Sequence, residues 1–389
     1  MGKTRKNITM NDDLSLLRES PFKEIVDQLE ELMTQSGRVF LLGAGCSKCA
    51  GLPLTSQLTK EVLASPNLND DSKEILTAIE SNFEGATFPN IEDYLSELVD
   101  LLAIADRRTS RNATKQDIVL DGKTYTRKKL HDAMDQIKRS ISDVIDKPNI
   151  SIDTHWDFIK AIHRPLRPGK SVANQIVDYL ILNYDTLIED ALALEMVTFT
   201  DGIDGGMTGW WNLKKFSDAG LSARVLKLHG SINWCQFPNE NLPRRISKTI
   251  GGSTVKDQRI VIWPASTKYR ETQIDPYAQL MSLARKVLRP KDGSQRVLAI
   301  CGYKFGDSHI NLELDQALRE SRDLTLVVFW SEDEIDGTLK LWHEDAFIRD
   351  QVLIYGKRGF WHGDVVCNAT TDLPWWKFEN VTRLLGGER

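Results

Sequence analysis

Residues that could carry chemistry follow four short apolar runs, and each run predicts a buried strand. They are Gly43, Ala44, Gly45 and Ser47 after 39–42, Asn183 and Asp185 after 176–182, His229 and Ser231 after 224–228, and Gly302, Gly306 and Asp307 after 296–300. In an open parallel sheet, ligands bind beyond the carboxyl ends of the strands. We therefore expect these residues to line one site.

The first of these stretches has two interpretations. Glycines at 43 and 45 would let the backbone approach a pyrophosphate and would leave N–H groups free at the start of a helix. The strict G-x-G-x-x-G pattern is not met, because Lys48 stands at the third glycine position and Gly51 follows three residues later. An ordinary glycine turn therefore fits this stretch as well as a phosphate-binding loop.

The later strand ends are also open to two interpretations each. Asn183 and Asp185 precede a predicted helix, so they could be plain N-caps, but they also suit ribose and amide recognition. A lone histidine is often structural, whereas His229, at a strand end beside Gly230, also suits a general base. The stretch 302–311 has two glycines around a polar turn, with room for a second half of a nucleotide.

The cysteines raise the question of a zinc site. Cys46 and Cys49 form a CxxC pair inside the glycine stretch, but Cys235, Cys301 and Cys367 form no second pair. A structural zinc needs four ligands, so we expect no metal here. An odd number of scattered cysteines is typical of reduced thiols in the cytoplasm.

The order of the elements predicts an α/β protein with a Rossmann-like open, mostly parallel sheet and helices on both faces. The predicted strands are 39–42, 176–182, 224–228, 259–263, 296–300 and 324–330. We expect an N-terminal arm and helix over 1–37, a core domain over 38–330 and a C-terminal extension over 331–389.

Residues from about 54 to 150 predict a helical insertion in the core domain. Asn90 is a suitable N-cap for a helix, and a turn at Asp121-Gly122 predicts a small hairpin. Two apolar stripes at helical spacing support this prediction: Ile91, Tyr94, Leu95, Leu98 and Leu102, and Leu130, Met134, Ile137, Ile141 and Ile145.

Composition excludes some classes of function. The net charge of −5 over 389 residues gives no global attraction to nucleic acid. The basic run 107–111 is typical of a solvated face, although it leaves a DNA-related role open. There is no apolar stretch of about 18 residues and no apolar core of a secretory signal near the N-terminus. We therefore expect a cytoplasmic protein without a membrane span.

Together, the motifs GAGxS…GLP, NYD, KLHGS and GYxFGDxHIN resemble the sirtuin-like (silent information regulator 2-like) domain over residues 38–330. More narrowly, they resemble the bacterial branch that hydrolyses NAD in anti-phage defence, in which a helix start like that at 90–95 is common. Two features differ from sirtuin deacylases: the second CxxC pair is missing, and Leu54-Thr55 replaces the FR pair of the deacylase motif.

This resemblance implies an NAD+ glycohydrolase that releases nicotinamide and ADP-ribose. It implies that Asn183 orients the ribose or the attacking water, that His229 is the base, and that Asp185 binds the nicotinamide amide. The other NAD-binding residues that it implies are Gly43, Ala44, Gly45 and Ser47 at the pyrophosphate, Ser231, and Gly302, Gly306 and Asp307, which would line the adenosine side or close the pocket.

Two other functions stay open on the sequence: an NAD-dependent protein deacylase, and a regulatory module that binds NAD or an ADP-ribose derivative. The resemblance also implies a ring-like homo-oligomer that docks on a HerA-type hexameric ATPase, so that nucleic acid would be met only through the partner. Trp342, Trp361, Trp375 and Trp376, beyond residue 330, could be core residues or could mark such an interface.

Overall fold

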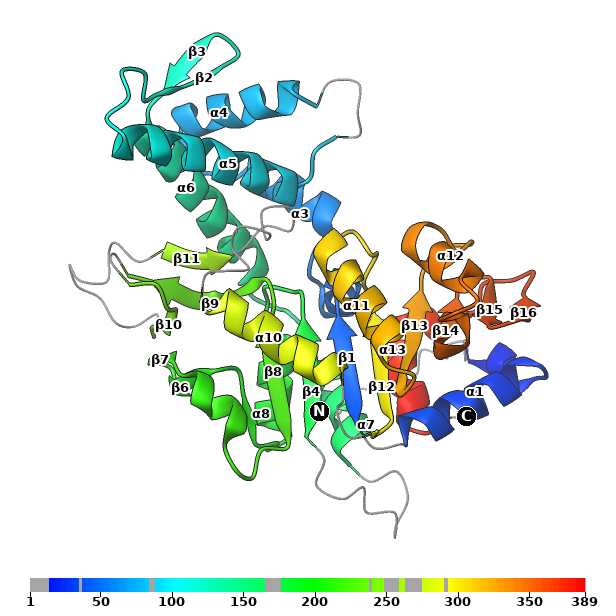
Figure 1. Ribbon diagram of the computed structural model, residues 1–389. Helices are drawn as coiled ribbons and strands as arrows, with labels where there is room; N and C mark the ends of the chain where they lie inside the picture. Colours follow the sequence, from blue (N-terminus) through cyan, green and yellow to red (C-terminus); the bar gives the residue numbers. More distant parts are fainter. Residues whose placement is uncertain are drawn as a thin grey trace, which may run out of the picture.

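The computed structural model of the chain describes residues 14–34, 37–83, 88–164, 176–237, 240–247, 259–262, 275–289 and 293–388. A nine-stranded sheet forms its centre, in the order β16-β15-β14-β13-β12-β1-β4-β8-β5 (Figure 1). Its strands are β1 (Arg38–Leu42), β4 (Val177–Ile181), β5 (Phe199–Thr200), β8 (Ala223–Lys227), β12 (Arg296–Cys301), β13 (Leu324–Trp330), β14 (Val352–Gly356), β15 (Gly359–His362) and β16 (Val365–Asn368). All neighbours from β5 to β14 pair in parallel, and β15 and β16 add an antiparallel hairpin.

The predicted fold class is confirmed, because five of the six predicted strands lie in this sheet.

The prediction for 259–263 is wrong in one respect. Residues Arg259–Ile262 form β11, which pairs antiparallel with β9 (Gly230–Gln236) in a second sheet, and residue 263 lies outside the described residues. β9 starts at Gly230, shortly after the end of β8, and the φ of +82° at this glycine allows a tight turn. The chain therefore reaches β9 without the helical crossover that a parallel strand would need. The other strands of the second sheet are β6 (Ile203–Gly205), β7 (Gly209–Trp211) and β10 (Arg244–Arg245).

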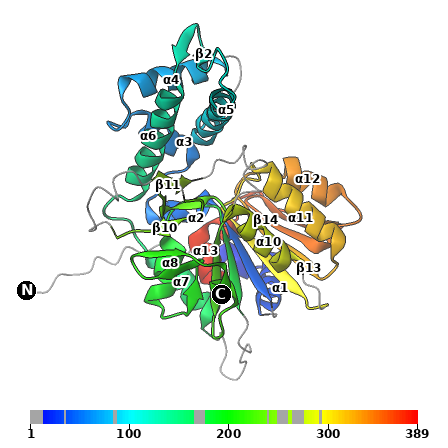
Figure 2. The same ribbon diagram turned by 60° about the vertical axis from the view of Figure 1, so that its left-hand side comes forward.

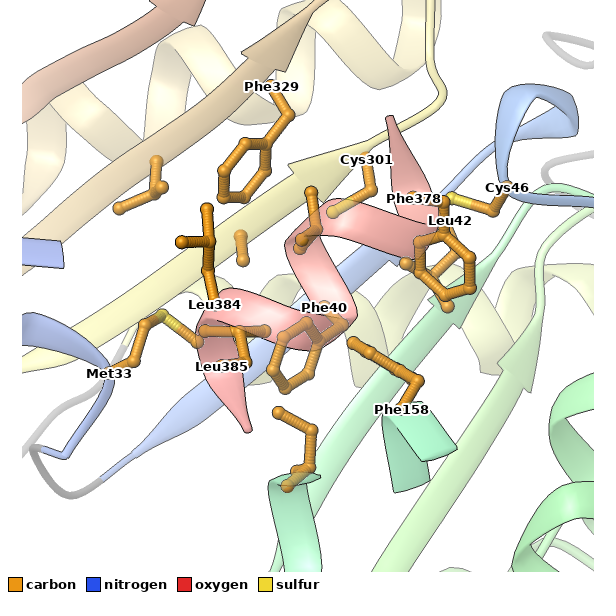
Figure 3. Packing of buried hydrophobic residues seen from close by; sticks show 14 of the residues in the cluster. Met33, Phe40, Leu42, Cys46, Phe158, Cys301, Phe329, Phe378, Leu384 and Leu385 are labelled. Carbon is orange, nitrogen blue, oxygen red and sulfur yellow. The ribbon is translucent and has the colours of Figure 1, made fainter. Parts of the chain in front are cut away.

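Helices cover both faces of the main sheet because its strands are apolar on both sides. In β1, Phe40 and Leu42 point into one core and Val39 and Leu41 into the other. The first core, shown in Figure 3, packs against α1 (Phe22–Met33), α7 (Asp153–His163), α8 (Leu187–Leu194) and α13 (Phe378–Leu385). The second packs against α10 (Tyr277–Leu288), α11 (Ser308–Glu320) and α12 (Gly337–Glu344).

A helical region with its own core stands off the end of the sheet at which β1 finishes (Figures 1 and 2). It consists of α3 (Thr55–Leu63), α4 (Asp70–Ser81), α5 (Ile91–Ser110) and α6 (Arg127–Ile145), with a hairpin of β2 (Ile118–Leu120) and β3 (Lys123–Tyr125). Both predicted apolar stripes are buried in it. Asn90 is the predicted cap of α5: its Oδ1 accepts from the Glu92 N–H at 2.8 Å, while Asp93 accepts from the Asn90 N–H at 2.8 Å.

The C-terminal residues belong to the main sheet, since β14 extends it in parallel beyond β13. Trp342, Trp361 and Trp375 are buried in its two cores, and Trp376 packs partly buried against one of them. These four residues therefore serve as core. None of the helices in the described ranges is long and apolar enough to cross a membrane.

One core residue makes the stability of this fold depend on pH. His155 of α7 is 1% exposed, and its ring centroid lies 5.1 Å from that of Phe378 in α13. Burial lowers the pKa of His155 to about 4, although the nearby Asp185 carboxylate opposes this shift. The folded protein therefore holds this imidazole neutral.

We predict that acidification destabilises the fold through His155. The unfolded chain takes up a proton near pH 6.5 and the folded chain only near pH 4, so the free energy of unfolding decreases as the pH falls through this window. The loss from this group is about 2 kcal/mol at pH 5. Urea unfolding at pH 7 and pH 5 should show a smaller loss for His155→Gln than for wild type, with His343→Gln on α12 as the control. An equal loss in all three proteins would contradict this prediction.

Candidate functional site

Four adjacent strands carry the predicted site residues at their carboxyl ends. The strands β12, β1, β4 and β8 are consecutive neighbours in the sheet, so the loops that follow them lie side by side. Most of the predicted residues meet in three contacts: one between the glycines at 43, 45 and 302, one around Ser47, and one between His229 and Asp307. Ala44, Gly306 and Ser231 lie outside these contacts.

The glycines form the first contact. The loop after β1 crosses the loop after β12: the Gly43 N–H donates to the Cys301 carbonyl, and the Gly45 N–H donates to the Gly302 carbonyl, both at 2.9 Å. A Cβ on Gly45 would lie 2.6 Å from the Gly302 Cα. Glycine is therefore required at these positions by the approach of two backbones, and the N–H groups of Gly43 and Gly45 serve this contact. Ala44, between them, is exposed.

Ser47 is the centre of the second contact. It ends the short helix α2 (Ala44–Ser47), and its Oγ donates to Asp185 Oδ2 at 2.7 Å and accepts from Asn183 Nδ2 at 2.7 Å. Asn183 Nδ2 also donates to the Gly43 carbonyl at 3.1 Å. The other oxygen of Asp185 accepts from the Leu187 N–H at 3.1 Å, at the start of α8. Asp185 therefore holds the first N–H of α8 from the residue before its N-cap, Thr186, and it also belongs to this polar cluster.

His229 and Asp307 form the third contact. His229 follows β8, is 2% exposed, and has its Nε2 3.9 Å from Asp307 Oδ1. A second imidazole, that of His309, lies near it, with ring centroids 6.2 Å apart. Asp307 is itself buried. The positive charge that His229 would gain on protonation would therefore interact with the Asp307 carboxylate in a region of low dielectric.

The loop that carries Asp307 is held by its own side chains. The Tyr303 hydroxyl donates to Asn311 Oδ1 at 2.9 Å and accepts from the Asp307 N–H at 3.1 Å, while Asn311 Nδ2 donates to the Phe305 carbonyl at 2.7 Å. Gly306 is exposed, and a Cβ there would meet open space. Of the two glycines in this loop, Gly302 is therefore required by packing and Gly306 is not.

Ser231 connects the second sheet to the site. It is fully buried in β9, and its Oγ donates to the Tyr184 carbonyl at 3.4 Å, while the Ile232 N–H donates to the same carbonyl at 3.0 Å. The turn 183–185 is thereby anchored from the strand that follows His229.

Sequence reasoning missed two charged residues that reach this turn. Glu92 belongs to the first turn of α5, and the Tyr184 hydroxyl donates to its Oε1 at 3.4 Å. Both the Glu92 and the Asp307 carboxylates raise the pKa of Tyr184, after the larger effect of burial. Lys227 is the last residue of β8 and contacts the Asp185 carbonyl. The helix start at 90–95 and the motif KLHGS contain these two residues, but only the tertiary fold brings them to this turn.

The cysteines of the glycine loop are protonated thiols. Burial raises the pKa of Cys49 to about 11 and that of Cys46 well above its usual value. The Cys49 thiol donates to the Cys46 carbonyl at 3.2 Å. Over the described part of the chain, no three His, Cys, Asp or Glu side chains gather closely enough to hold a metal ion.

A hollow of about 910 Å³ lies elsewhere, on the second sheet. Its described lining residues are Trp210, Trp211, Glu240, Asn241, Leu242, Pro243, Arg244 and Asp275. None of the predicted site residues is among them. The candidate site at the strand ends therefore does not coincide with this hollow.

Part of the chain is similar to a known protein family. Residues 179–349 match the family model of the SIR2-like domain. Among solved structures, the chain is similar to a Sir2 homologue in complex with NAD (12% identity, TM-score 0.41), with 93% of this chain and 92% of that chain covered. It is similar also to a variant Sir2 homologue in complex with ADP-ribose (13% identity, TM-score 0.40; 93% and 96% covered). No curated protein matches the chain significantly. The SIR2-like match starts within β4 and includes β8 and β12, and it therefore contains Asn183, His229 and Asp307.

We predict that Gly302→Ala destabilises the protein strongly. Gly302 has a φ of +64°, and a Cβ there would lie 2.4 Å from the Cys46 backbone nitrogen. Strain of the left-handed conformation and the backbone clash together should cost about 3 kcal/mol or more. Thermal and urea unfolding would measure the loss.

Gly306→Ala is the matched control, because it lies in the same loop without a steric neighbour. Its stability should stay within about 0.5 kcal/mol of wild type. Equal stability of both variants would show that the crossing of the two loops does not require glycine.

Proposed function

We propose that the protein is an NAD+ hydrolase that cleaves the bond between nicotinamide and ribose, giving nicotinamide and ADP-ribose. One observation carries this proposal. An anchored asparagine and a buried histidine paired with a carboxylate follow the adjacent strands β4 and β8, inside the stretch that matches the SIR2-like domain. A module for binding alone does not need a base of this kind.

The reaction determines what the site must supply. Cleavage of the N-glycosidic bond develops positive charge on the ribose, while nicotinamide leaves as a neutral molecule, so no strong general acid is needed. The protein must hold the ribose, orient a water molecule and accept its proton. Side chains fixed by buried hydrogen bonds meet this demand without reorganisation.

Asn183 is assigned to the ribose or the attacking water. Both of its hydrogen bonds described above are donated by Nδ2, to Gly43 and Ser47, and they fix the plane of the amide. The acceptor Oδ1 is then the atom that would receive a hydrogen bond from a ribose hydroxyl or from the water. Rotation of the amide would break both anchoring bonds.

His229 is assigned as the base, acting on the water directly or through a ribose hydroxyl. The imidazolium formed when it accepts the proton would be stabilised by Asp307, 3.9 Å from Nε2. Asp307 therefore has a role beside the base in this proposal, in addition to lining the adenosine side with Gly302 and Gly306.

The remaining residues would hold the substrate. Gly43, Ala44, Gly45 and Ser47 are proposed to border the pyrophosphate, where the exposed Ala44 is the accessible member. The resemblance assigns Asp185 to the nicotinamide amide. Because both its carboxylate oxygens already accept internal hydrogen bonds, we propose that Asp185 instead orients Ser47 and through it Asn183.

We further propose a cytoplasmic role in anti-phage defence, with the chain in a ring-like homo-oligomer bound to a HerA-type ATPase. The support is the resemblance of the motifs, together with a requirement of the reaction: unrestrained hydrolysis would deplete the NAD of the cell. Control by a partner would prevent this in uninfected cells.

We predict that Asn183→Ala and His229→Ala keep the fold and reduce nicotinamide release by at least about a hundredfold. The measurement is release from NAD by the purified chain, with and without a co-purified ATPase, with NAD binding followed by calorimetry. His343→Ala, on α12, is the control and should retain full activity. Full activity of Asn183→Ala would exclude the assigned mechanism.

The other functions predict different results in the same experiments. NAD binding without release under any condition would indicate a sensor of NAD or ADP-ribose. Release that requires an acetylated peptide, with loss of its acetyl group in mass spectrometry, would indicate a deacylase.

A further inference from the structure

We propose that Lys227 is a positioning residue, which fixes the turn carrying Asn183 and Asp185 relative to the strand end carrying His229. Its contribution to catalysis rests on the proposed function, whereas its effect on the turn does not.

The side chain of Lys227 is enclosed in the protein. Lys227 is 0% exposed, its Nζ donates to the Asp185 carbonyl, and the same Nζ lies 3.4 Å from Glu189 Oε1. Glu189 belongs to α8 and is also buried. One ammonium group therefore joins the end of β8 to both the turn before α8 and the first turn of that helix.

The position of Lys227 in the sheet gives this contact its importance. In the parallel pair of β4 and β8, Lys227 is the partner of Ile181, two residues before Asn183. Two residues after Lys227 comes His229. The two proposed catalytic residues therefore leave the sheet at the same level on adjacent strands, and Lys227 bridges the two turns at that level.

Packing alone does not explain a lysine here. Its neighbours in β8, Val225 and Leu226, are apolar and buried, and an apolar residue at 227 would avoid the cost of desolvating an ammonium group. What an apolar residue could not supply is the hydrogen bond to the Asp185 carbonyl. That bond fixes the backbone of Asp185. The Asp185 carboxylate accepts from the Ser47 hydroxyl, which in turn accepts from the Asn183 amide.

The test compares Lys227→Met with wild type by hydrogen exchange and by kinetics. Exchange of the amides of Leu187 and Ile232, which donate to Asp185 Oδ1 and to the Tyr184 carbonyl, reports the order of the turn without substrate. We expect faster exchange at these amides, and a decrease in kcat of about tenfold to a hundredfold with little change in KM. Lys340→Met, an exposed lysine of α12, is the matched control and should change neither readout.

A second variant addresses the buried carboxyl that Lys227→Met leaves behind. Burial raises the pKa of Glu189 to about 7 against the opposing charge of Lys227, so Lys227→Met/Glu189→Gln removes any penalty from an unpaired charge. Glu189→Gln by itself keeps the bond from Lys227 to Asp185 and should retain most of the activity. If the single variant does not fold, the double variant should fold and show the loss of kcat.

The outcomes separate the two proposals. Unchanged exchange at Leu187 and Ile232 in a folded Lys227 variant would overturn the positioning role. A Lys227 variant with a lower melting temperature but the wild-type kcat per folded molecule would also overturn the positioning role. A wild-type chain that never releases nicotinamide would reject the proposed hydrolase, while faster exchange in the variant would still support Lys227 as the residue that fixes the turn.

Discussion

The contact between the loops after β1 and β12 is the constraint on which the site depends. Their backbones approach more closely than any Cβ would allow, and two N–H groups of one loop donate to carbonyls at the end of the other strand. This crossing fixes the short helix α2, and with it Ser47, in contact with Asn183 after the end of β4. A larger residue at 43, 45 or 302 would separate the loops and move Ser47 away from Asn183.

Around this contact, polar side chains are held by groups from different parts of the chain. Ser47 comes from the first loop, Asn183 and Asp185 from the turn after β4, and Lys227 from the end of β8. Buried polar groups are costly unless they are paired, so each partner restricts the positions open to the others. The cluster is therefore held by mutual hydrogen bonds among the described residues, and the proposed stabilisation of a developing charge would benefit from such pre-arranged groups.

The helical region also takes part in the site. Glu92, in the first turn of α5, accepts from the hydroxyl of Tyr184, and Tyr184 and Leu187 belong to the same apolar cluster as α3–α6. The capping box at Asn90 fixes the start of α5 and thereby the place of Glu92. This region therefore borders the turn that carries Asn183. A shift of the region would change the contacts that Tyr184 and Leu187 make in this turn.

The sequence by itself determined the elements whose signals are local. Buried strands are continuous apolar runs and α5 starts at a recognisable cap, so five strands of the sheet and the start of this helix could be predicted. Tertiary structure decided what depends on partners distant in sequence. An apolar run such as that of β11 does not show whether the strand pairs in parallel or antiparallel. The place of β14 in the main sheet is likewise set by its pairing with β13. Likewise, the glycines at 43 and 45 indicated that another group approaches the backbone closely, but the sequence did not show that this group is the backbone of Gly302. Glu92 and Lys227 reach the turn after β4 only through the tertiary fold.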